Sequence, residues 1–168
     1  MQISMYAASA PRFVHVLRNL SAMLDKAQAH AEARKIDPAA LTTFRLFPDM
    51  FPLSRQVQTV CDVSKGAVAR LAGVGVPNHE DTEQTFPELK ARIAKTIDFI
   101  NTIKPEQING AEDKAITLKL GKQEYTFKGM QYLLNFAYPN FYFHAVTVYN
   151  ILRHNGVELG KKDFVGEF

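Results

Sequence analysis

Apolar residues recur at helical spacing in four long segments of this 168-residue chain, and that periodicity constrains the fold more than any other feature. In the first segment, which runs through about residue 34, the shared apolar face comprises Tyr6, Ala10, Phe13, Leu17, Leu20, Leu24 and Ala31. The second segment begins near Asp49 and ends at 73–77, and its inward positions are Leu53, Val57, Val60, Ser64, Val68 and Leu71. Amphipathic segments of this length predict helices that pack their apolar faces together.

The third predicted helix has the clearest start in the sequence. Thr85 and Glu88 have the spacing of a capping box, in which each side chain bonds a backbone N–H of the other residue. The inward row that follows comprises Leu89, Ile93, Ile97, Ile100 and Ile103. We therefore predict that this helix begins at residue 85 or 86.

A β-hairpin is predicted between the third and fourth helices. The tract AITLKLGKQEYTF has two alternating runs around Gly121 and Lys122, a pattern typical of paired strands. Because an isolated hairpin is marginally stable in water, we expect it to pack against helix ends. The side chains expected in that contact are Ile116, Leu118, Leu120, Tyr125 and Phe127. The tail after Gly156 lacks periodicity, so we expect an extended or irregular cover there.

The stretch from Gly129 to Gly156 is predicted to form one long helix with two polar residues in the middle of its apolar face. At about 100° per residue, Asn140 and His144 fall on the stripe shared by Leu133, Ala137, Val148 and Ile151. Burial of a polar group without a partner costs about 1 to 3 kcal/mol. Asn140 and His144 must therefore be hydrogen-bonded, hydrated or coordinating another group.

Four amphipathic helices with one long connection before the last predict a helix bundle, formed as a single all-α domain over residues 1–168. Sites in bundles are built from inward side chains on facing helices. Gln56 borders the same interior as Asn140 and His144. We predict that these three residues converge on one polar pocket that binds a ligand, with Tyr6 as a candidate fourth member.

Composition argues against several classes of function. The net charge is +3, but the positive residues are scattered among acidic ones, so no nucleic-acid partner is expected. No apolar run approaches the roughly 18 residues of a membrane span, and no secretory leader is evident, so we expect a cytoplasmic protein. The single Cys61 excludes an internal disulfide and is expected to be a core thiol rather than a nucleophile. His15 and His79 are expected to be solvated.

Three tracts carry a resemblance to a known family: MFPLSRQVQ, LKLGKQEYTFKG and, above all, PNFYFHAVTVYNILRHNGVELG. Over nearly its full length the chain resembles the DinB/YfiT-like superfamily of bacterial four-helix bundles, and within it the branch called domain of unknown function 1993. The resemblance implies an up-down-down-up bundle with a small β-hairpin inserted before the last helix. Members typically bind a divalent metal through three histidines, and several are thiol-dependent transferases or isomerases.

The resemblance also places the family's metal positions on this sequence. His144 matches the second histidine of the pair on the last helix, and Asn140 stands where the first would be. The histidine of the second helix is replaced by Gln56 or, as a weaker match, Gln58. Because amide oxygens are weak ligands for zinc or nickel, we expect this metal site to be degenerate and no cofactor to be bound.

Three functions stay open, and whether the protein is an enzyme stays open with them. The first is small-molecule binding, with His144 as a candidate acid or base and with Gln56 and Asn140 orienting the ligand. The second is a metal-dependent or thiol-dependent transferase. The third is a non-catalytic homodimer in which the same residues serve the structure. The aromatic run over residues 136–143 either packs the hairpin or forms a subunit interface.

Overall fold

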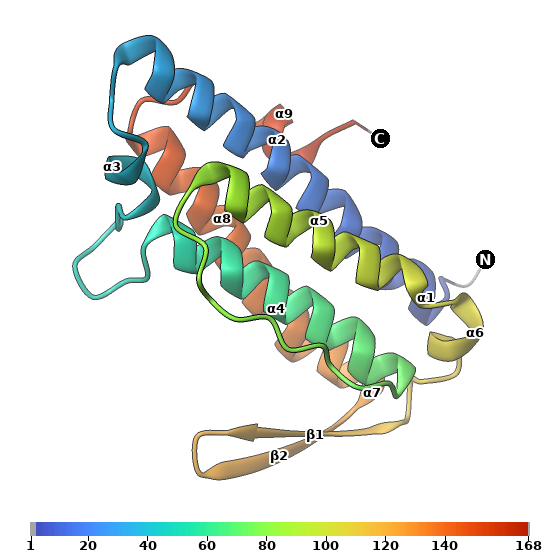
Figure 1. The fold of residues 1–168 in the computed structure, drawn as a ribbon. Helices are drawn as coiled ribbons and strands as arrows, with labels where there is room; N and C mark the ends of the chain where they lie inside the picture. The colour runs from blue at the N-terminus through green and yellow to red at the C-terminus, as the bar shows by residue number, and fades with distance from the viewer. Residues whose placement is uncertain (1–2, 168) are drawn as a thin grey trace.

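Four long helices lie side by side in the computed structural model, which describes residues 3–167 (Figure 1). These helices are α2 (Ala10–Arg34), α4 (Leu53–Ala72), α5 (Phe86–Thr102) and α8 (Tyr138–His154). α4 and α5 run in one direction, and α2 and α8 run in the other (Figure 1). Because α4 and α5 are parallel neighbours, residues 73–85 run back along α4 to connect them (Figure 1). The predicted bundle and its up-down-down-up order are confirmed.

The helix ends follow local chemistry. The capping box at the start of α5 is present, because Thr85 Oγ1 accepts from the Glu88 backbone while the Glu88 carboxylate accepts from the Thr85 backbone. α4 begins at Leu53 rather than near Asp49. Pro52 caps it in an extended conformation, and the residue before a proline is disfavoured in the helical region.

The predicted hairpin is present and projects from the bundle beyond α7 (Gly129–Tyr132) (Figure 1). Its antiparallel strands are β1 (Ala115–Leu120) and β2 (Gln123–Lys128). Ile116 and Leu118 are buried and Phe127 is half-buried, as expected of residues packed on helix ends. Leu120 and Tyr125 are 44% and 42% exposed instead, and Leu120 directly precedes the turn between the strands.

The last long helix contains a π-helical turn, η1 (Leu133–Ala137), between α7 and α8. A π-turn holds more residues than an α-turn, so it rotates the side chains that follow it relative to the side chains that precede it. The buried face of α8 comprises Phe141, Ala145, Thr147, Val148, Ile151 and Leu152. Asn140 and His144 lie on the predicted stripe with the buried Val148 and Ile151, and each is half-buried.

The C-terminal tail packs across α2 and includes a one-turn helix, α9 (Lys161–Val165), where an extended or irregular cover was expected. His15 Nε2 lies 2.6 Å from the Val165 carbonyl oxygen, and Asn19 Nδ2 donates to the Phe164 carbonyl at 3.0 Å. His15 is therefore half-buried rather than solvated.

The other short helices of the described residues sit at the ends of the long ones. They are α1 (Met5–Ala8), α3 (Pro38–Thr42) and α6 (Pro105–Ile108). Within residues 3–167, no helix combines the length and the apolarity required to cross a membrane.

Candidate functional site

A hydrogen bond joins Gln56 of α4 to His144 of α8, the two helices that share the largest contact in the bundle. His144 Nδ1 lies 2.6 Å from Gln56 Oε1, and Gln56 is only 1% exposed. Gln56 Nε2 donates to the Phe51 carbonyl at 3.1 Å, which identifies Oε1 as the acceptor toward His144. His144 Nδ1 therefore carries the proton, and Nε2 holds the lone pair of the neutral ring.

Two phenylalanines flank the His144 ring. Phe51 stacks on it with centroids 6.3 Å apart and an interplanar angle of 15°, and Phe143 meets it edge-on at 5.2 Å. Burial lowers the pKa of His144 below its ordinary value of 6.5, and the Arg55 guanidinium lowers it further. The imidazole is therefore neutral near pH 7, with Nε2 able to accept a hydrogen bond or a proton.

The lowered pKa of His144 predicts that acid weakens the fold. Below pH 6.5 the His144 ring takes up a proton more readily in the unfolded state than in the folded state. The contribution of the neutral ring to the unfolding free energy is therefore present above pH 6.5 and is lost as the pH falls below it. Urea unfolding at pH 7.5 and 5.5 should show a drop in wild type and a smaller drop in His144→Gln. The pKa of His79 is also lowered by burial, so His79→Gln is measured alongside. Equal drops in wild type and His144→Gln would contradict the prediction.

Asn140 lies one turn of α8 before His144 and lines a cavity of about 430 Å³. This cavity, called here the hairpin cavity, lies where α4, β1 and the π-turn meet, and its walls include Val63, Arg70, Leu118, Tyr132, Phe136 and Asn140. π-turns within α-helices are frequent at functional sites. The structure therefore places Asn140 beside a cavity, and not in the hydrogen-bonded pair.

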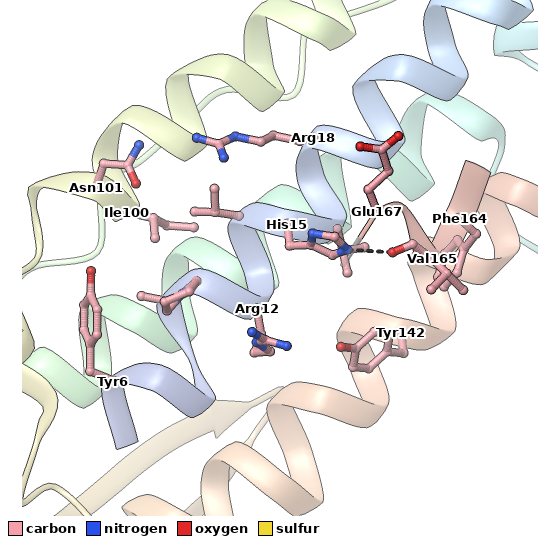
Figure 2. A pocket seen from close by; sticks show the side chains of 14 residues that line it. Tyr6, Arg12, His15, Arg18, Ile100, Asn101, Tyr142, Phe164, Val165 and Glu167 are labelled. Atoms are coloured by element: carbon pink, nitrogen blue, oxygen red, sulfur yellow. Dashed lines mark hydrogen bonds between the residues drawn. The ribbon is translucent and has the colours of Figure 1, made fainter. Parts of the chain in front are cut away.

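Tyr6 lines a different cavity, of about 760 Å³, which extends along α2. Figure 2 shows Tyr6 at one end of this α2 cavity, Val165 and Glu167 toward the other, and Arg12 and His15 between them. The structure thus joins Gln56 to His144, places Asn140 one helical turn away, and leaves Tyr6 in separate surroundings.

A buried ion cluster around Arg92 was missed in the sequence. Arg92 is 2% exposed, and its guanidinium lies 2.8 Å from Asp62, 3.0 Å from Glu83 and 3.1 Å from Asp81. It also donates to the Glu80 carbonyl at 2.8 Å. His79 was expected to be solvated but is half-buried, and Arg92 holds the acidic residues that follow it against α4 and α5. The sequence signal that could have found this cluster is Arg92 itself, a charged residue directly beside Ile93 of the inward apolar row.

The residues at the family's metal positions do not fit a three-ligand metal centre. Gln56 Oε1 accepts a hydrogen bond from His144 Nδ1 and is not free to act as a ligand, and Asn140 lines the hairpin cavity instead. Within residues 3–167, no three His, Cys, Asp or Glu side chains form a group that could hold a metal ion. The donor set of one imidazole and two amides is also a poor match to zinc or nickel.

Cys61 is expected to be inert while the protein is folded. Its side chain is fully buried, and burial raises the pKa of the thiol to about 12. An aromatic disulfide reagent at pH 8 should leave native Cys61 unmodified and label it fully after addition of guanidinium chloride. Rapid stoichiometric labelling of the native protein would contradict this prediction and would restore Cys61 as a candidate nucleophile.

Known proteins resemble this chain along nearly its full length. The profile of the family described as Domain of unknown function (DUF1993) matches residues 5–165, which include all four long helices. A crystal structure of a DinB family member protein from Shewanella denitrificans is 40% identical, with a TM-score of 0.90. The match covers 97% of this chain and 92% of that chain. No curated protein matches the chain at a significant level.

Proposed function

Because the chain belongs to the DUF1993 family, a DinB-like branch of helical bundles, we propose that it binds a small molecule between α4 and α8. The observation that carries the proposal is the hairpin cavity, lined by Asn140 one turn before His144, whose Nε2 makes no hydrogen bond within residues 3–167. Its volume of about 430 Å³ is within the range of ligand pockets.

Each polar residue has a distinct part in this proposal. The Asn140 amide offers both a donor and an acceptor to a ligand in the cavity. His144 Nε2 is the acceptor, or the base, for a ligand that extends toward it. Gln56 is a positioning residue, because its Oε1 fixes the orientation and tautomer of the His144 ring. Tyr6 takes no part, since it lines the α2 cavity.

A metabolite screen by thermal melting tests the proposal. A ligand that binds only the folded state raises the melting temperature by mass action. We expect hits that stabilise the wild type and fail to stabilise Asn140→Leu. The matched control is Asn150→Leu, an exposed position on the same helix, which should keep the full shift. Equal shifts in both variants, or the absence of any hit, would contradict a site in the hairpin cavity.

A specific observation favours a homodimer as a second candidate function. Phe51, Phe143 and Val146 are 46%, 58% and 40% exposed, and both phenylalanine rings flank His144. Exposed apolar residues gathered on one surface are typical of subunit interfaces. Light scattering should give twice the 18.9 kDa chain mass for wild type and the monomer mass for Phe143→Ser. Leu134→Ser, at an exposed position of η1, is the control, and a monomeric wild type would rule the interface out.

A further inference from the structure

We propose that the ligand of the hairpin cavity is an organic carboxylate and that the Arg70 guanidinium binds its charged group. This inference rests on the proposed function, since it names the class of molecule that the same cavity receives. Arg70 lies near the end of α4, is half-buried, and lines the cavity together with Asn140.

The Arg70 guanidinium has unused donor capacity. Its Nη1 lies 3.3 Å from the Tyr132 hydroxyl, a neutral partner. Within residues 3–167, no carboxylate lies at ion-pair distance from it, whereas the buried Arg92 has three. A guanidinium carries five N–H donors in a planar fork that matches a carboxylate. Arg70 can therefore bind an anion without first giving up an internal ion pair.

Gly66 provides the space in which the Arg70 head group lies. Gly66 is buried within α4, where glycine costs about 0.5 to 1 kcal/mol of stability relative to alanine. A Cβ atom built on Gly66 would overlap Arg70 Nη1 and would lie 3.4 Å from Arg70 Cζ. The glycine thus lets the guanidinium fold back over α4 toward Tyr132 and the cavity.

The other walls of the hairpin cavity fit a carboxylate that has an apolar body. Leu118 and Phe136 supply apolar surface, and Lys119 of β1 adds a second positive charge. Asp62 also lines the cavity, but its Oδ1 is held by Lys65 at 2.9 Å and by Arg92 at 2.8 Å. Because Asp62 is paired with these cations, its carboxylate offsets little of the positive charge that Arg70 and Lys119 bring to the cavity.

The test is a titration of the ¹⁵N-labelled protein with 2-naphthoate at millimolar concentrations, monitored by amide chemical shifts. The neutral isostere 2-naphthamide is titrated in parallel. We expect shifts around Asn140 and Phe136, with affinity for the acid at least about tenfold higher than for the amide, as charged hydrogen bonds predict.

Three variants test which positively charged side chain binds the carboxylate of 2-naphthoate. Arg70→Gln removes the positive charge, and Gly66→Ala displaces the guanidinium while favouring the helix, so both should fold and lose about tenfold in affinity for 2-naphthoate. Arg18→Gln, in the α2 cavity, is the control and should bind as wild type does. Melting curves of each variant check that the fold is retained.

The other outcomes separate the two proposals. Equal binding of acid and amide in the hairpin cavity, unaffected by Arg70→Gln, would overturn the carboxylate inference and leave the small-molecule site standing. Loss of binding in Arg18→Gln but not in Arg70→Gln would move the anion site to the α2 cavity. If neither compound shifts amides around the hairpin cavity, both the inference and the proposed function are contradicted.

Discussion

Replacing Arg92 with methionine is expected to lower the unfolding free energy by about 3 kcal/mol, because it leaves a cluster of carboxylates without its central cation. Asp62, Asp81 and Glu83 converge on this guanidinium. Removing one member of a buried ion pair typically costs about 3 to 5 kcal/mol. The carboxylates keep between 14% and 39% exposure, so water relieves part of the repulsion and the lower end applies. Urea unfolding at pH 7 measures the change.

Two further variants isolate the role of the Arg92 cluster. Arg18→Met removes an exposed arginine and should change stability by no more than about 0.5 kcal/mol. Adding Glu83→Gln to Arg92→Met should restore part of the loss, since it removes one of the charges left behind. A loss below about 1 kcal/mol in Arg92→Met would contradict the view that this cluster anchors residues 73–85.

Gly129→Ala is expected to destabilise the protein by about 3 kcal/mol, the upper end of the usual cost of overpacking, although alanine normally favours a helix. A Cβ atom at position 129 would overlap the carbonyl oxygen of Ala111 and lie 3.0 Å from its carbonyl carbon. The obstacle is backbone, so no side-chain rotation relieves it. The adjacent hydrogen bond from Met130 N to the Glu112 carbonyl, 2.9 Å long, should also weaken.

The glycine comparison has an internal control. Gly75 has open space where its Cβ would lie, so Gly75→Ala should be neutral within about 0.5 kcal/mol. Thermal and urea unfolding of both variants give the comparison. If Gly129→Ala matches wild type, then α7 and the backbone at Ala111 are not packed as closely as the structure shows.

Features governed by neighbouring residues were predictable from the sequence. The capping box at Thr85, the hairpin turn and the four amphipathic helices each depend on spacings within a few residues. Gln56 was also placed correctly beside His144, because α4 is a regular helix over that stretch and a constant rotation per residue applies.

Features set by distant contacts were not predictable in this way. The π-turn over Leu133–Ala137 was not predicted, because the apolar spacing of residues 129–156 is that of a regular α-helix. The cavity beside Asn140 was missed as well, because one of its walls is β1, which a helical projection does not include. Arg92 pairs with Asp62, which is thirty positions away on another helix. A single sequence carries periodicity along a helix but no signal for which charges meet across the bundle.

A crystallographic fragment screen of the native protein tests the central claim most directly. The account predicts fragments bound in the hairpin cavity, with polar atoms at hydrogen-bond distance from the Asn140 amide and carboxylates on the Arg70 guanidinium. Fragments that gather only in the α2 cavity, with the hairpin cavity left empty across a diverse library, would contradict it.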